Sequence, residues 1–397
     1  MEICIIGPDL NPPFTEAQRN MARELGIQLT YLGHNVHIVT DNSKKLPCEE
    51  TIDGLHLHRL SSRMFAFEAV KKMSELNERY HFDVVHCQNL ATKKSFILMK
   101  GLRERLGVPV VAYVCLQPSL SFINWIFEMK NDAVEGLKRM KEFTPRLITR
   151  NALGAVDQIV TSSDFLRGKI AKAAQIDRDK IEVIHPFINF ENFARLASNF
   201  ASRRADVGVS ETSPLFLFVG THSIFRGEAE FSRAFALLLK EYPDAKAALF
   251  VSSHFPTRII RLAKSLNIEK SLIFIHEVNY ESIATLMAAS DVYVFCGLSS
   301  LSGGSIDPPL TIIEAMALGK SCVAYNFGGV KELIQFGNIS LVEPHRVYEL
   351  VSKMSQALKE KRTNDNHQER KRALINEFDS KTATKRFLSI YEKAICQ

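Results

Sequence analysis

The chain has 397 residues, which is too long for one ordinary domain and suits two domains of about 190 residues each. Hydrophobic residues make up 46% and charged residues 24%, typical of a globular chain, and this balance excludes collagen-like and low-complexity proteins. The net charge is only +6, so the composition does not favour a protein that binds nucleic acid.

The seven cysteines are scattered, and the sequence contains no CxxC pair and no Cys–His cluster. This usage indicates a reducing compartment, which for this chain means a cytoplasmic location, and it predicts neither a disulfide framework nor a metal site. No apolar run reaches the roughly 18 residues that would cross a membrane, so no transmembrane helix is expected.

The first half alternates short apolar runs with amphipathic stretches. Buried parallel strands are predicted at residues 3–6, 36–40, 84–86, 108–114, 159–162 and 181–184, and helices at 15–31, 66–80, 93–106 and 165–174. This alternation predicts a doubly wound α/β domain over residues 1–190.

Residues 191–213 are polar and without period, and they predict a linker. The alternation then restarts over residues 214–358. Strands are predicted at 215–219, 247–251, 272–275, 292–295 and 322–325, with helices at 228–241, 256–266, 280–289 and 310–318. Residues 359–397 form a basic helical tail, which we expect to pack back on the N-terminal domain. Two Rossmann-like, parallel-sheet domains would therefore face a cleft that holds the ligand.

The stretch from Asp307 to Glu314 reads DPPLTIIE and predicts a helix that begins at Leu310, because two prolines precede it. The backbone amides of Leu310 and Thr311 lack helical acceptors and suit a phosphate. The Glu314 carboxylate leans toward the same helix end, where it suits ribose hydroxyls. An alternative is that Glu314 only complements the helix dipole.

A second candidate anion site is the loop that follows the strand ending at Gly220. Arg226 in this loop could contact a diphosphate with two hydrogen bonds, although an ordinary surface arginine is the alternative. The loop matches neither the dinucleotide fingerprint GxGxxG nor a P-loop.

Together these segments resemble the retaining GT-B glycosyltransferases of glycosyltransferase family 4, the "glycosyl transferases group 1" type. Gly220-Thr221 and Arg226-Gly227 are similar to the family's strand–Gly–Arg–(four residues)–Lys–Gly loop. The stretch DPPLTIIEA resembles its Glu–(seven residues)–Glu motif, and MALGKSCVAYNFGGVKELI continues the similarity. In the first half, LTYLGHNVHIVT, FDVVHCQ and VDQIVTSSDFLRGKI are similar to family segments.

The resemblance implies a nucleoside diphosphate sugar of the UDP or GDP type as donor, with no metal and no further cofactor. Arg226 would bind the diphosphate, Glu314 the ribose, and the amides of Leu310 and Thr311 the distal phosphate. Transfer would retain the anomeric configuration, with the leaving phosphate accepting the proton of the acceptor hydroxyl.

Three positions, Thr221, Ile306 and Cys115, depart from the family pattern. Thr221 replaces the first arginine of the diphosphate pair, and Ile306 stands where the first glutamate is expected. Asp307 follows one residue later and is the candidate catalytic carboxylate. Cys115 stands where the family often has a histidine near the sugar, and packing is the alternative role for its thiol.

The acceptor is expected to be a glycan, a lipid-linked sugar or another hydroxyl compound. Glu16, Arg19 and Asn20 at a helix start, together with Cys115, are the acceptor-side candidates. For Glu16 the alternative is simple complementation of the helix N-terminus.

The aromatic residues Phe122, Trp125 and Phe127 precede a basic stretch, which predicts peripheral contact with the cytoplasmic membrane face. The alternative there is a core helix with a solvated basic end. For the whole chain, a sugar-nucleotide epimerase or hydrolase of the same fold and a degenerate non-catalytic GT-B subunit stay as alternative functions.

Overall fold

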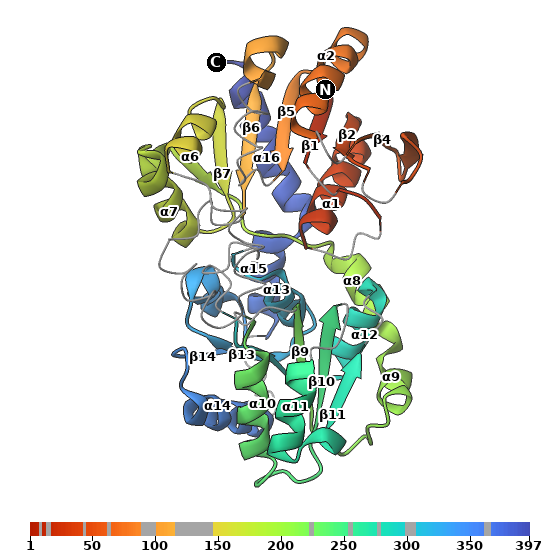
Figure 1. Ribbon diagram of the computed structural model, residues 1–397, viewed down its shortest axis with the longest axis vertical. Coiled ribbons are helices and arrows are strands. Elements are labelled where there is room, and N and C mark those ends of the chain that lie inside the picture. Colours follow the sequence, from red (N-terminus) through yellow and green to blue (C-terminus); the bar gives the residue numbers. More distant parts are fainter. Residues whose placement is uncertain are drawn as a thin grey trace. The chain divides into compact units, whose positions relative to one another are not determined.

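The computed structural model describes residues 1–7, 10–12, 17–42, 45–61, 65–88, 101–115, 146–221, 226–252, 257–275, 279–297, 307–360 and 367–397. The chain divides into two compact units (Figure 1). Unit 1 comprises Met1–Phe187, Ser300–Asp307 and Ser380–Gln397, and unit 2 comprises Ile188–Ser299 and Pro308–Asp379.

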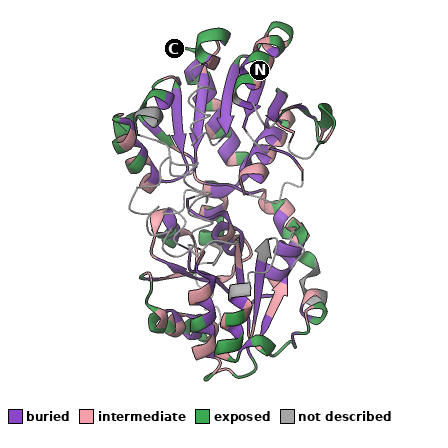
Figure 2. Cartoon of the chain, in the orientation of Figure 1, coloured by how far each residue is buried: buried purple, intermediate pink, exposed green. Residues whose placement is uncertain are grey.

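Unit 1 is built on an eight-stranded sheet with the order β3-β4-β2-β1-β5-β6-β7-β8. All neighbours are parallel except β3 and β4. The strands are β1 (Glu2–Ile6), β2 (Asn35–Asp41), β3 (Glu49–Ile52), β4 (Leu55–Leu60), β5 (Val84–Gln88), β6 (Val110–Val114), β7 (Gln158–Thr161) and β8 (Ile181–Val183). The strands β1, β5, β6 and β7 are buried almost throughout, as expected when helices cover both faces of a parallel sheet (Figure 2).

The sequence prediction missed the pair β3 and β4. The two strands are antiparallel and joined by Asp53 and Gly54, both with positive φ angles of 54° and 80°. An Asp-Gly pair is the turn that such a hairpin prefers, so this signal was present in the sequence.

The helices of unit 1 are α1 (Ala17–Tyr31), α2 (Phe65–Tyr80), α6 (Arg146–Leu153), α7 (Asp164–Ala174) and α16 (Ser380–Ile395). The last of these packs on α1, β5 and β6, although it is distant in the sequence from the part of unit 1 that ends at Phe187. Phe387 of α16 lies edge-on to Tyr113 of β6 with the ring centroids 5.3 Å apart, and both side chains are fully buried. The apolar stripe of the tail therefore completes the core of unit 1.

Unit 2 is built on a six-stranded parallel sheet with the order β11-β10-β9-β12-β13-β14. The strands are β9 (Leu215–Thr221), β10 (Lys246–Ser252), β11 (Leu272–Ile275), β12 (Val292–Phe295), β13 (Ser321–Tyr325) and β14 (Ile339–Val342). Renumbered within the unit, this is the order 3-2-1-4-5-6 of a Rossmann sheet. The predicted pair of doubly wound parallel-sheet units is confirmed, whereas β14 was not predicted.

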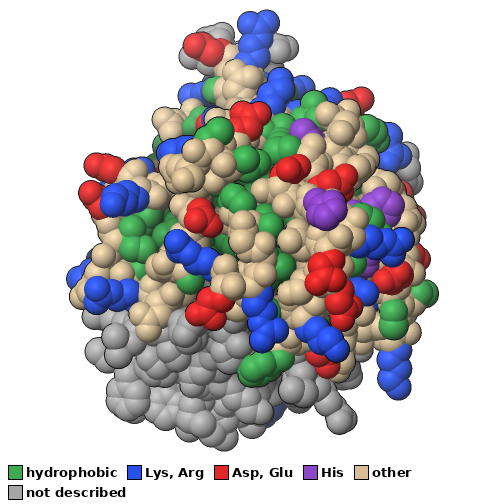
Figure 3. Space-filling view, turned by 90° about the horizontal axis from the view of Figure 1, so that it is seen from above, with side chains coloured by type: hydrophobic (Ala, Val, Ile, Leu, Met, Phe, Trp, Pro, Cys, Tyr) green, Lys and Arg blue, Asp and Glu red, His purple; other side chains and the backbone are tan. Residues whose placement is uncertain are grey.

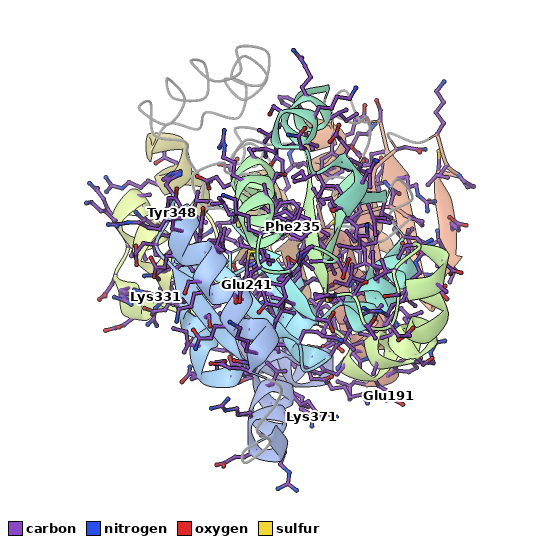
Figure 4. The ribbon with its side chains drawn as sticks, turned by 90° about the horizontal axis from the view of Figure 1, so that it is seen from below. Glu191, Phe235, Glu241, Lys331, Tyr348 and Lys371 are labelled. Carbon is purple, nitrogen blue, oxygen red and sulfur yellow. The ribbon has the colours of Figure 1, made fainter. Side chains whose placement is uncertain are left out.

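The helices of unit 2 are α8 (Phe190–Leu196), α9 (Phe200–Asp206), α10 (Glu228–Leu238), α11 (Thr257–Leu266), α12 (Tyr280–Ala289), α13 (Leu310–Ala317), α14 (Val347–Lys359) and α15 (His367–Phe378). Helix α10 packs on α14. Shortly after α10, the carboxylate of Glu241, labelled in Figure 4, accepts hydrogen bonds from Ser355 and Lys359 of α14. Phe235 of α10, also labelled there, is fully buried beside Phe216 of β9.

Residues 191–213, for which the sequence predicts a linker, carry the helices α8 and α9. Both pack on α12, and the rings of Phe193 and Tyr280 lie 5.3 Å apart. The Arg204 guanidinium is buried and donates to the carbonyl oxygens of Ala289 and Ser213 at 2.6 and 2.5 Å. The buried Arg204 thus ties this segment to backbone oxygens of unit 2. The polar composition of the segment does not indicate such a contact.

A histidine cluster stabilises the β2–β4 edge of unit 1. The His37 ring is buried, stacks on the His58 ring at 5.3 Å and shares a 3.0 Å hydrogen bond with it. Burial, together with the neighbouring His58, lowers the pKa of His37 to about 4. His37 is therefore neutral in the folded protein, whereas in the unfolded chain it takes up a proton below about pH 6.5.

Acid should destabilise this edge of the sheet. We expect the free energy of unfolding to fall as the pH drops from about 6.5 toward 4, because the unfolded state then binds more protons. In His37→Leu the loss between about pH 7.5 and about pH 5, measured by urea titration, should be smaller by up to about 2 kcal/mol. The control is His56→Leu, at an exposed position of β4. An equal pH dependence in His37→Leu and wild type would contradict this interpretation.

Candidate functional site

The candidate donor site lies in unit 2 at the carboxyl ends of β9 and β12. The strand order reverses between these two neighbours, and ligands of open α/β sheets bind beside such a reversal. The loop after β9 and the segment leading to α13 after β12 are the two regions that the sequence singled out.

Gly227 brings the loop after β9 against the end of β12. It has a φ of +80°, and a Cβ atom built there would lie 2.3 Å from the Cys296 carbonyl oxygen. Arg226, the preceding residue, is half-buried, and its Cβ lies 3.6 Å from where a Gly220 Cβ would stand. The structure thus holds Arg226 against the end of β9, next to β12.

Helix α13 begins where the two prolines predict. Pro309 is its N-cap and supplies no side-chain hydrogen bond, so no side-chain cap satisfies the first amides, those of Leu310 and Thr311. Tyr293 of β12 donates a 2.7 Å hydrogen bond to the Thr311 hydroxyl. This bond ties the first turn of α13 to the strand beneath it.

Glu314 is a buried acid in the second turn of α13, with 3% of its surface exposed. Burial raises the pKa of Glu314 to about 7, and a hydrogen bond from Tyr280 opposes that rise. A carboxyl group of this kind can switch between donor and acceptor of hydrogen bonds near neutral pH.

The predicted site elements converge on Tyr293. Its phenol is fully buried and is influenced electrostatically by both Glu314 and Arg226. Burial is the main reason that the pKa of Tyr293 is raised. Sequence reasoning missed Tyr293 and Tyr280. A lone tyrosine in the otherwise apolar strand sequence VYVF was the available signal for Tyr293.

Asp307, the candidate catalytic carboxylate, is buried within unit 1. Ser163, the N-cap residue of α7, donates a 2.8 Å hydrogen bond to its carboxylate. The Ser162 hydroxyl donates to the Asp307 carbonyl oxygen at 2.6 Å. The Asp307 amide donates to the Cys115 carbonyl oxygen at 3.3 Å. These bonds join residues 115 and 307 at the carboxyl ends of β6 and β7, and they assign Asp307 an anchoring position with 2% exposure.

The acceptor-side candidates are Arg19, Asn20 and Cys115, together with Glu16, which lies outside the described residues. Arg19 and Asn20 are in the first turn of α1, with Asn20 buried. The Cys115 thiol is fully buried and its pKa is raised by burial, which agrees with a packing role. The side chain of Thr221, and all of Glu16, Ile306, Phe122, Trp125 and Phe127, lie outside the described residues.

Structural comparison defines the class of protein. Over 100% of this chain and 99% of the other, the fold is similar to sucrose-phosphate synthase of Thermosynechococcus elongatus, with a TM-score of 0.79 and 17% identity. HepE of Anabaena in complex with UDP is similar over 99% of this chain and 100% of its own, with a TM-score of 0.72 and 15% identity. The chain has the GT-B fold, with two Rossmann-like units.

Two family matches identify the chain more closely. "Glycosyltransferase Family 4" matches residues 18–192, and "Glycosyl transferases group 1" matches residues 199–374. N-acetyl-alpha-D-glucosaminyl L-malate synthase of Bacillus anthracis is 22% identical over 93% of this chain and 91% of its own. D-inositol 3-phosphate glycosyltransferase of Streptomyces scabiei is 25% identical over 74% of this chain and 64% of its own. The chain belongs to the GT-B glycosyltransferases of the family 4 type.

The helices, the charged surface and the possible metal ligands add three findings. Among the helices that the structure describes, none is long and apolar enough to cross a membrane. Acidic and basic side chains are interspersed over the face shown in Figure 3. In the described ranges, no group of three or more His, Cys, Asp and Glu side chains is arranged to hold a metal ion.

Replacing Gly227 should damage the site. Gly227→Ala strains a left-handed backbone by about 1–2 kcal/mol and also drives a methyl group into the Cys296 carbonyl. Gly208→Ala is the matched control, because its φ is +69° but no atom lies within 4 Å of the added Cβ. Urea denaturation should show a clearly larger loss for Gly227→Ala, and equal losses would contradict the close approach.

Proposed function

We propose that this glycosyltransferase moves a sugar from a nucleoside diphosphate sugar of the UDP or GDP type to a hydroxyl group, with retention of the anomeric configuration and without a metal. Unit 2 binds the donor and unit 1 the acceptor. The observation that carries the proposal is the convergence of Arg226, Glu314 and the first turn of α13 around Tyr293.

Each group at the site matches one part of such a donor. The Arg226 guanidinium pairs with the diphosphate, and the amides of Leu310 and Thr311 bind the distal phosphate at the positive end of α13. The Glu314 carboxylate accepts hydrogen bonds from the ribose hydroxyls. Tyr293 positions the α13 turn through Thr311. The UDP and UDP-glucose complexes of HepE are consistent with this class of ligand for a protein of this fold.

The reaction breaks the bond between the anomeric carbon and the phosphate oxygen and forms a bond from that carbon to the acceptor oxygen on the same face. The acceptor proton passes to the leaving phosphate. Negative charge therefore grows on the diphosphate, and the protein contributes mainly by stabilising that charge and by positioning both substrates. Arg226 and the α13 amides supply the stabilisation that a cation would otherwise supply.

The acceptor is a glycan, a lipid-linked sugar or another hydroxyl compound. The names of two relatives point to small polar acceptors, since they contain L-malate and D-inositol 3-phosphate. We propose a cytoplasmic enzyme, with peripheral membrane contact through Phe122, Trp125 and Phe127.

The proposal is tested by donor binding and product stereochemistry. UDP-, GDP- and ADP-sugars are screened by thermal shift, and the product formed with an acceptor is examined by NMR at its anomeric proton. Arg226→Ala should weaken UDP binding at least about tenfold while uridine binding is unchanged, since only the diphosphate contacts the guanidinium. Arg233→Ala, an exposed arginine of α10, is the control.

Three outcomes would contradict the proposed function. Conversion of the donor sugar without an acceptor indicates an epimerase or a hydrolase. Failure of every nucleotide sugar to bind indicates a degenerate subunit. An inverted product excludes retention.

Donor affinity should depend on pH through Glu314. The pKa of Glu314 is about 7 in the free protein, and ribose hydroxyls that donate to the carboxylate favour its ionised form. Binding therefore releases a proton near and below pH 7, so affinity should rise with pH up to about 7 and then level off. Calorimetry of UDP-glucose in buffers of different ionisation enthalpy measures the release.

The control is Glu314→Gln, which keeps the size of the side chain but cannot titrate. It should bind the donor more weakly, and with no proton release that can be assigned to this position. UDP-glucose is chosen because its phosphates do not titrate near neutrality. Proton release that is the same in Glu314→Gln and wild type would exclude the ribose role.

A further inference from the structure

The carboxyl end of β5 in unit 1 carries a buried glutamine, Gln88, to which neither the family resemblance nor the predicted acceptor residues assign a role. Gln88 is the last residue of β5, with 2% exposure. It lies beside β1 where the strand order of this sheet reverses, the position at which α/β sheets bind ligands. A Cβ atom on Gly7, just after β1, would come within 2.9 Å of the Gln88 carbonyl oxygen.

A chain of buried hydrogen bonds fixes the Gln88 side chain. The Tyr391 hydroxyl of α16 lies 2.7 Å from His86 Nδ1, and His86 Nε2 lies 2.9 Å from Gln88 Oε1. All three side chains are buried, and burial lowers the pKa of His86 to about 4, so its ring is neutral.

The protons of all three groups are fixed once the buried Tyr391 proton is required to have an acceptor among these contacts. Tyr391 donates to Nδ1, so the single ring proton of His86 is on Nε2 and is donated to Gln88 Oε1. In the other neutral tautomer of His86, with the proton on Nδ1, the buried Tyr391 proton would have no acceptor among its described contacts. The Oε1 atom is therefore committed to His86, and the two N–H groups of Nε2 face away from that bond.

The Nε2 amide of Gln88 is left without a hydrogen-bond partner among the residues that the structure describes. A buried amide in this state destabilises the folded protein, and such groups are rare in native proteins. Gln158 of β7 is a useful contrast, because it is also a buried glutamine but its Nε2 donates to Gln397 Oε1 at 3.0 Å.

We propose that the Gln88 amide donates a hydrogen bond to a hydroxyl or carboxylate oxygen of the acceptor substrate and helps to select that acceptor. The inference rests on the proposed function, because it takes unit 1 as the acceptor-binding unit. Tyr391 and His86 act as positioning residues that turn the N–H side of Gln88 toward the ligand. An ordered water that completes the amide in every state is the competing explanation.

Gln88→Glu is the sharpest variant, because an ionised carboxylate still accepts the His86 Nε2 proton but offers no donor in place of the amide. The assay is run at alkaline pH, since burial raises the pKa of a carboxyl group. Gln158→Glu is the matched control, the same substitution at the amino end of another strand of this sheet. The assay uses UDP-glucose and UDP-N-acetylglucosamine as donors with L-malate and D-inositol 3-phosphate as acceptors.

We expect Gln88→Glu to lower kcat/KM for the acceptor at least about tenfold, as the loss of a buried hydrogen bond predicts. The donor dissociation constant from calorimetry should be unchanged. Gln158→Glu should change neither quantity.

Equal kcat/KM values for Gln88→Glu and wild type would overturn the inference and favour a structural water. It is also overturned if neither acceptor is used by the wild type. Donor binding decides the proposed function separately, so the two failures are distinguishable.

The positioning role has its own readout. Tyr391→Phe removes the proton that fixes the His86 tautomer, so the Gln88 amide can reverse and KM for the acceptor should rise. In the Gln88→Glu background the same change should have little further effect on that KM, because the two residues act through one hydrogen bond to the ligand. Additive effects in this double-mutant cycle, or an unchanged His86 tautomer in nitrogen NMR, would contradict the positioning role.

Discussion

The close approach of Gly227 to Cys296 is the constraint on which the candidate donor site depends. A glycine is required there twice over, by its positive φ and by the 2.3 Å that would separate any Cβ from the carbonyl oxygen. Because this contact fixes the loop after β9 against the end of β12, it also fixes the start of α10 and the preceding Arg226. A cationic side chain on a loop would otherwise lose much of its advantage to conformational entropy. Backbone geometry therefore performs part of the electrostatic preorganisation of the site.

The buried Glu314 shows how the same site balances stability against binding. Desolvation places its pKa near 7, so the free protein does not hold a fully ionised carboxylate in its interior. The hydrogen bond from Tyr280 offsets part of the desolvation penalty of the ionised Glu314 carboxylate, but not all of it. Tyr280 is itself anchored by Phe193 of α8, at a ring distance of 5.3 Å. The helices in the segment predicted as a linker thus support a side chain that acts on the site.

The sequence was sufficient for the fold because parallel strands buried on both faces are continuous apolar runs, and helices between them keep their period. It was sufficient for the start of α13 because two prolines stop a helix by simple sterics. It was not sufficient for Tyr293 or for the anchoring of Asp307, since both depend on contacts between distant residues. A tyrosine in a strand is most simply read as core, and only the 2.7 Å bond to Thr311 distinguishes it.

The two units share an architecture but present different chemistry at their strand reversals. Unit 2 places a guanidinium, helix amides and an acid with a shifted pKa at its reversal, a set suited to a charged phosphate donor. At the reversal of unit 1, the described network of Tyr391, His86 and Gln88 is neutral, because burial holds His86 uncharged. A neutral N–H group recognises an oxygen atom by the geometry of the hydrogen bond. Its contribution to the binding free energy depends on whether that hydrogen bond forms or the buried N–H group stays unpaired. In the function proposed above, this charge difference between otherwise similar sheets divides donor from acceptor recognition.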